Sequence, residues 1–84
     1  MNIEKLELAI LRILNDAPQQ SFTSDHIHSD VNHSQPVAVS RSAVWQALEF
    51  LAARNQIAQA TVEGVIRTSI ASAGIFRVLK APGE

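Results

Sequence analysis

The spacing of apolar residues changes at Ile57, and this change constrains the fold more than any other feature of the chain. Before Ile57, apolar residues recur every three or four positions, which is typical of amphipathic helices. After it, "AQATVEGVIRTSIASAGIFRVLK" is rich in Val, Ile and Thr and is interrupted by "EG" and "SAG", which favours strands joined by turns. With 84 residues, the chain can build one modest core. We therefore expect a single α+β domain over residues 1–84.

Two helices are expected in the first third of the chain. A helix over about 3–15 follows from the apolar stripe and ends before Pro18; the stripe consists of Ile3, Leu6, Ile10, Ile13 and Leu14. Thr23 is a good N-cap, and Phe22 and Ile27 stand at the positions of a hydrophobic staple, so a second helix is expected over about 23–31. A loop around Pro36 follows, because proline lacks the backbone amide.

Leu8 lies outside the apolar stripe of the first helix, near Glu4 and Arg12. It is either a lone exposed leucine, which is ordinary, or a contact with a second copy of the chain.

The segment "VSRSAVWQALEFLAARNQI" predicts a third helix over about 40–54. Ser40 is its expected N-cap, and Val39 and Val44 repeat the staple pattern. One side of this helix is expected in the core and carries Ala43, Val44, Ala47, Leu48, Phe50 and Leu51. The other side is expected to face solvent and carries Ser42, Trp45, Gln46, Glu49 and Ala53.

A strand pair is expected over about 57–80, with its turn at Glu63–Gly64, at Ala71–Gly74, or at both. Three helices followed by a β-hairpin wing are the order of a winged helix-turn-helix protein. Such proteins place the last of the three helices in the major groove of DNA.

The composition argues against several other functions. The sequence contains no cysteine, no glycine-rich phosphate loop and no catalytic motif. The carboxylates are expected on polar helix faces. We therefore expect that the protein is not an enzyme and has no catalytic residue and no cofactor. His26 and His28 would point in nearly opposite directions on a helix, so His26, His28 and His33 are expected to be exposed and no metal site is predicted. No apolar run is long enough for a membrane span, and a cytoplasmic location is the default expectation.

The charge is distributed unevenly along the chain. The net charge is -1, but residues 1–39 hold two Lys or Arg against five Asp or Glu, whereas residues 40–84 hold five against three. We therefore expect the C-terminal half to meet any anionic partner.

The solvent side of the third helix suggests a DNA-reading surface. Ser and Gln can bond to base edges, Arg can bond to guanine or phosphate, and Trp can pack on a thymine methyl group. The alternative for Trp45 is burial against the wing or the first helix. The predicted DNA-contacting residues are Ser40, Arg41, Ser42, Trp45, Gln46, Arg67 and Arg77.

Residues 6–66 resemble the DNA-binding half of the ferric uptake regulator family. That family has the pattern "SxATVYRxLxxLxxxGxI", which the chain matches at Ser40, Val44, Leu48, Leu51 and Ile57. It departs from the pattern with Trp45 in place of Tyr, Gln46 in place of Arg and Asn55 in place of Gly. "SRSAVWQALEFL" is also similar to the helix of biotin-repressor-type winged helices. The resemblance implies duplex DNA binding with Ser42, Trp45 and Gln46 facing the major groove, but not metal sensing, because the chain stops where the family's metal-binding domain begins.

Two functions remain open from the sequence. One is sequence-specific binding of double-stranded DNA by a small transcriptional regulator that acts as a homodimer or beside a partner protein, since few positive charges mean weak binding by one copy. The other is a winged-helix module that binds proteins and not DNA. The second function predicts that Trp45 belongs to an apolar patch continuous with the wing.

Overall fold

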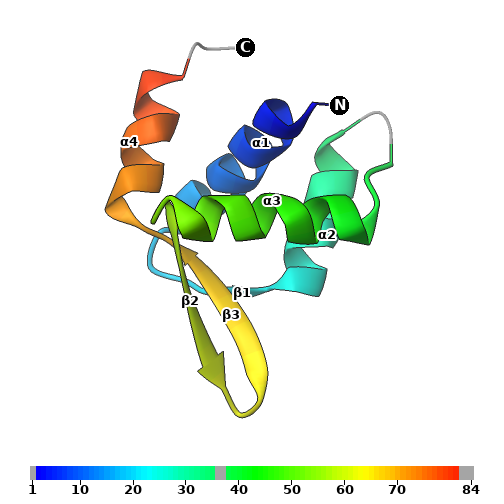
Figure 1. The fold of residues 1–84 in the computed structure, drawn as a ribbon, viewed down its shortest axis with the longest axis vertical. Helices are drawn as coiled ribbons and strands as arrows, with labels where there is room; N and C mark the ends of the chain where they lie inside the picture. Colours follow the sequence, from blue (N-terminus) through cyan, green and yellow to red (C-terminus); the bar gives the residue numbers. More distant parts are fainter. Residues whose placement is uncertain (1, 36–37, 82–84) are drawn as a thin grey trace.

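The computed structural model describes residues 2–35 and 38–81, in which three helices are followed by a hairpin and a further helix (Figure 1). The elements are α1 (Ile3–Asp16), β1 (Phe22–Thr23), α2 (Ser24–Ser34), α3 (Arg41–Ala53), β2 (Ile57–Val62), β3 (Val65–Ile70) and α4 (Ser72–Lys80). The predicted α+β winged-helix order is confirmed. Pro36 lies outside the described residues. None of the described helices is both long and apolar enough to cross a membrane.

The first three helices begin where a polar side chain caps the first turn. The amide of Lys5 donates to Oδ1 of Asn2 at 2.9 Å. The predicted caps Thr23 and Ser40 are confirmed: their hydroxyl oxygens accept from the amides three residues later, each at 3.2 Å. These bonds satisfy amides that have no partner within the helix, so each starting point is specified locally.

The core lies where α1, α2 and α3 pack together, and most of the predicted stripe of α1 contributes to it. The fully or nearly fully buried apolar residues are Leu6, Ile10, Leu11, Leu14, Ile27, Val31, Val44, Ala47, Leu48, Leu51, Ile57 and Ile70. The expectation for Phe50 is wrong, because its side chain is 40% exposed. Phe50 lies roughly 130° from the centre of the buried stripe of α3, which Val44, Leu48 and Leu51 define. Ile3, in the first turn of α1, is also partly exposed.

The sheet has three antiparallel strands in the order β1-β3-β2. Val62 pairs with Val65, so of the turn positions considered, the hairpin turns at Glu63–Gly64. Glu63 and Gly64 both have positive φ, 52° and 79°, as a two-residue hairpin turn of type I′ requires. The two-residue strand β1 was not predicted; Phe22 pairs with Thr68 and makes β3 the central strand.

The expectation that the hairpin extends to residue 80 is wrong, because residues 72–80 form α4. β2 pairs with β3 along its whole length, and β1 pairs with it at Arg67 and Thr68, so the hairpin is complete at Ile70. Ile75 and Val78, three positions apart, instead pack against the core from a helix. Gly74 permits this packing, since a Cβ atom there would overlap the carbonyl oxygen of Gln56.

Glu7 also departs from expectation, because it lies in the core and not on a polar helix face. Its side chain is 1% exposed, and its Oε1 atom accepts hydrogen bonds from Arg54 at 2.8 Å and from Arg77 at 2.7 Å. A buried carboxylate is tolerated when cations pair with it. Glu7 therefore joins α1 to the end of α3 and to α4.

Candidate nucleic-acid interface

The N-terminal half of α3 presents the side chains expected to read DNA. Ser42, Trp45 and Gln46 are exposed, and the hydroxyl oxygens of Ser40 and Ser42 lie 3.3 Å apart. A shallow hollow of about 420 Å³ is lined by Arg41, Ser42, Trp45, Gln46 and Glu49. Five of the seven predicted residues thus lie together at the start of one helix.

Trp45 stands between α3 and the hairpin. Its side chain is 38% exposed, so it is neither fully buried nor isolated in solvent. A second hollow, of about 300 Å³, has Trp45 on one side, the start of α2 on another and the hairpin turn on the third; it is lined by Thr23, Ser24, Asp25, Trp45, Gly64, Val65 and Ile66. Val62, Val65 and Ile66 are exposed at this end of the hairpin. The indole is therefore next to an apolar surface of the wing.

Arg41, the cation at the start of α3, is paired with an acid from α2. Its Nη1 atom donates to Oδ1 of Asp25 at 2.6 Å, and both side chains are about two-thirds exposed (65% and 66%). Glu49 lines the same hollow as Arg41. The surface around Trp45 is therefore close to neutral, and the expected positive charge of the C-terminal half is not concentrated there.

Arg67 and Arg77, the two other predicted cations, bond within the protein. Arg67 is half-buried, and its Nε and Nη2 atoms donate to the hydroxyl and the carbonyl oxygen of Ser21, both at 2.9 Å. Arg77 belongs to α4 and not to the wing, and it donates to Glu7 and, at 2.9 Å, to Gln56. The structure therefore does not bring these two guanidinium groups to the start of α3.

The position of α3 relative to α2 is set by polar contacts at Val39. The amide of Val39 donates to Oδ1 of Asn32 at 2.6 Å, and Nδ2 of Asn32 donates to the carbonyl oxygen of Val39 at 3.2 Å. His28 Nε2 donates to the same oxygen at 2.8 Å. His28 is half-buried, contrary to the expectation of exposure, whereas His26 and His33 are exposed.

Sequence reasoning missed Asp25, Asn32 and the wing residues Val65 and Ile66 as parts of this site. Asp25 lies in the first turn of α2, and nothing in the sequence around it marks it as the partner of a residue 16 positions later. Asn32 lies just beyond the helix expected over 23–31, whereas in the structure it belongs to α2. Their roles depend on how α2 and α3 cross.

Two solved structures resemble the chain closely in fold. The apo form of a ZitR double mutant from Lactococcus lactis aligns with a TM-score of 0.72 and 21% identity, covering 94% of this chain and 55% of ZitR. BpsR from Bordetella bronchiseptica, whose DNA binding is regulated by 6-hydroxynicotinic acid, aligns with a TM-score of 0.68 and 20% identity, covering 89% of this chain and 50% of BpsR. The chain thus spans about half the length of each.

No protein-family model matches the chain, and no curated protein matches it. The specific resemblance to ferric uptake regulators is not confirmed. At about 20% identity the two structures establish the fold: the chain is a winged helix.

Proposed function

We propose that this protein binds duplex DNA in a sequence-specific manner as a small transcriptional regulator, with the N-terminal half of α3 in the major groove. The observation that carries this proposal is Trp45, a partly exposed indole between Ser42 and Gln46 at the start of the third helix of a winged helix. In helix-turn-helix proteins, the first residues of this helix are the ones that reach base edges. The structural likeness to BpsR, a protein with regulated DNA binding, supports the same function.

The chemistry of the exposed residues fits this role. Gln46 can form two hydrogen bonds to adenine, and Trp45 offers an apolar face to a thymine methyl group. The amides at the start of α3, beside Ser40, favour a nearby phosphate, as does Arg41 once it leaves Asp25. Specificity in this proposal comes from base contacts, and only a small part of the affinity comes from charge.

The near-neutral surface supports action as a dimer. A single copy offers one cation, Arg41, at the start of α3, and phosphate neutralisation provides most non-specific affinity. A homodimer brings two recognition helices to half-sites roughly 34 Å apart and doubles the contacts.

Fluorescence anisotropy with random-sequence duplexes, followed by selection of bound sequences, tests the proposal. If the two Arg41 side chains of a dimer make the main phosphate contacts, log K should fall with log salt with a slope of about -2. Trp45→Ala should abolish selection of a preferred sequence. Lys5→Ala, which removes an exposed charge on α1, is the control and should leave binding unchanged. A folded protein that binds no duplex even at low salt would refute the proposal.

A second function is favoured by one observation. Trp45, Val65 and Ile66 line the same hollow, so the indole belongs to an apolar surface that continues onto the wing, as a protein-binding module requires. In that case, Ile66→Ser and Trp45→Ala should weaken capture of the same partner equally, and the binding should be insensitive to salt. Under the DNA proposal, Ile66→Ser should affect binding less than Trp45→Ala.

A further inference from the structure

Helix α4 carries apolar side chains on two faces. Ile75 and Val78 are partly buried and pack on the core. Phe76 and Leu79, three positions apart, point away from the core and are 59% and 75% exposed. One apolar face is sufficient to hold a short helix on a core, so the second face is free to contact another molecule.

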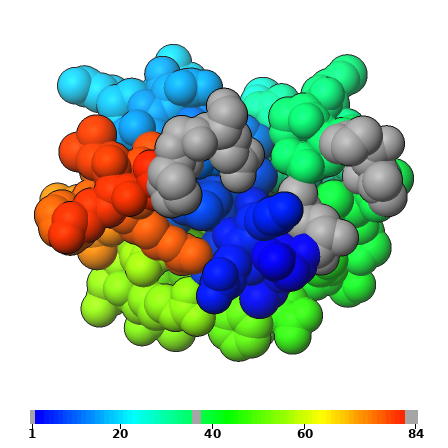
Figure 2. Space-filling model, turned by 90° about the horizontal axis from the view of Figure 1, so that it is seen from above, coloured from blue at the N-terminus to red at the C-terminus, as the bar shows by residue number. Residues whose placement is uncertain are grey.

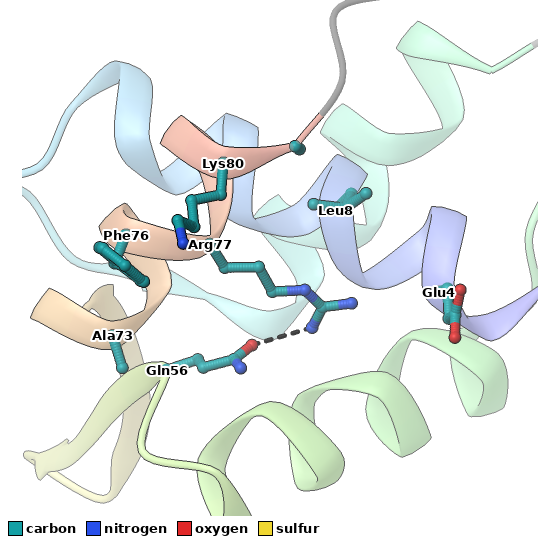
Figure 3. A pocket seen from close by; sticks show the side chains of 8 residues that line it. Glu4, Leu8, Gln56, Ala73, Phe76, Arg77 and Lys80 are labelled. Atoms are coloured by element: carbon teal, nitrogen blue, oxygen red, sulfur yellow. Dashed lines mark hydrogen bonds between the residues drawn. The ribbon is translucent and has the colours of Figure 1, made fainter.

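A groove of about 610 Å³ lies between α1 and α4, and Phe76 of the second face forms part of its wall. It is lined by Glu4, Leu8, Gln56, Ala73, Phe76, Arg77, Lys80 and Ala81 (Figure 3). Leu8, which the sequence places outside the apolar stripe of α1, is half-buried here. The groove is open and Phe76 is well exposed, whereas small-molecule sites bury most of their ligand, so the groove fits a macromolecular surface better.

The two ends of the groove carry opposite charges. Figure 3 shows Glu4 on α1 at one end and Lys80 and Phe76 on α4 at the other, with Leu8 and Arg77 between them. The ammonium group of Lys80 lies 4.9 Å from the centre of the Phe76 ring. A twofold axis through the groove exchanges its ends, so it would bring Glu4 of each copy towards Lys80 of the other. The charge pattern is therefore self-complementary.

The groove is also well separated from the surface proposed to read DNA. In Figure 1, α4 lies at the opposite end of the molecule from the hairpin turn. Figure 2 shows α4, in orange and red, and the start of α1, in deep blue, on one face of the molecule. A contact through this face leaves Trp45 and the hairpin turn uncovered, whereas a contact through Val65 or Ile66 would lie next to Trp45.

We propose that two copies of this chain associate through the α1–α4 groove. Phe76 and Leu79 of each copy pack into the groove of the other, and Glu4 of each copy faces Lys80 of the other. This interface rests on the proposed function, because it is the surface through which the proposed homodimer forms. It does not depend on DNA.

Sedimentation equilibrium of the full chain and its variants tests this interface in the absence of DNA. The wild-type chain should dimerise, and Leu79→Ser should raise the dimer dissociation constant by about tenfold or more, because the side chain is buried in both copies. Val62→Ser, at an exposed apolar position of the hairpin, is the matched control and should leave the dissociation constant unchanged. All these positions are exposed in the monomer, and thermal unfolding followed by circular dichroism should show that each variant still folds.

Charge reversal tests the pairing itself. Glu4→Lys and Lys80→Glu should each weaken dimerisation by roughly tenfold, because each places like charges together twice. The double variant, Glu4→Lys with Lys80→Glu, should restore wild-type dimerisation. Arg77 is left intact because it holds Glu7.

Three outcomes would overturn the inference: a wild-type chain that stays monomeric up to about 100 µM, a dimer weakened by Val62→Ser and not by Leu79→Ser, or a double charge variant that dimerises no better than the single variants. Anisotropy with duplex DNA separates the two proposals. A dimer that binds no DNA overturns only the proposed function, and a monomer that binds DNA overturns only this interface.

Discussion

The guanidinium group of Arg77 on α4 donates a 2.7 Å hydrogen bond to the carboxylate of Glu7 on α1, although the two residues lie 70 positions apart. Arg54 donates to the same oxygen, Oε1, at 2.8 Å. The other carboxylate oxygen, Oε2, is buried and accepts no hydrogen bond from the described residues. Glu7 is thus a buried charge whose stability depends on the two arginines.

Replacing Arg77 with alanine should destabilise the fold by about 2–4 kcal/mol, because the buried carboxylate loses its more buried partner. Arg41→Ala is a matched control that breaks the exposed pair with Asp25, and it should cost less than about 1 kcal/mol. Urea unfolding of both variants measures the difference. Equal losses would show that the Glu7–Arg77 pair behaves like a surface ion pair.

A double variant examines the origin of that loss. Glu7→Leu together with Arg77→Leu removes both charges, and buried ion pairs can be replaced by apolar groups at little cost. The double variant should therefore be more stable than Arg77→Ala in the same urea experiment. If the double variant were less stable than Arg77→Ala, the Glu7–Arg77 pair itself would stabilise the fold, beyond neutralising the buried charge of Glu7.

Gly74→Ala should destabilise the protein by about 1–3 kcal/mol through overpacking. Helix propensity alone predicts the opposite, a gain of about 1 kcal/mol. The reason is space: a Cβ atom at Gly74 would overlap the carbonyl oxygen of Gln56 and lie 3.1 Å from Cγ1 of Ile70. Thermal unfolding of this variant, with the exposed Ser72→Ala in the same helix as control, decides between the two effects. A higher melting temperature for Gly74→Ala would contradict the close packing of α4.

Asn55 follows α3 with a φ of 59°, in the left-handed region. Asn55→Gly should leave stability unchanged or slightly increased, whereas Asn55→Ala should cost about 1 kcal/mol, because a Cβ atom is disfavoured at this φ. Comparing the two variants in urea isolates the backbone effect, since both lose the same side-chain amide. Equal stabilities would show that the end of α3 can relax to another conformation.

Asp25→Asn should strengthen DNA binding roughly threefold to tenfold, because it frees Arg41 for phosphate and removes a negative charge beside the proposed interface. Asp30→Asn is the control, since Asp30 is on the same helix but contacts His26 at 3.1 Å and not Arg41. Anisotropy at fixed salt measures both. Equal increases in DNA affinity for the two variants would indicate a general effect of net charge, with no specific role for Arg41.

The sequence by itself determined the elements whose signals are local. Thr23 and Ser40 cap the amides three residues later, so α2 and α3 begin where predicted. Val44, Leu48 and Leu51 follow the helical period and are buried as predicted. The hairpin turn lies at one of the two predicted positions, because the Glu63–Gly64 pair accepts two positive φ angles. These features depend on residues within one turn or one hairpin, which a single sequence displays directly.

Only the tertiary structure decided the secondary structure of residues 72–80 and the partners of the arginine side chains. "SAGIFRVLK" has β-branched residues that suit a strand, but Ile75 and Val78 pack on the core from a helix, and Gly74 allows that helix to approach Gln56 closely. Arg41, Arg67 and Arg77 all read as possible phosphate contacts. Their partners Asp25, Ser21 and Glu7 lie 16, 46 and 70 positions away in the sequence. Because these contacts form only in the folded chain, the local sequence pattern does not show which arginines can still bind an external phosphate.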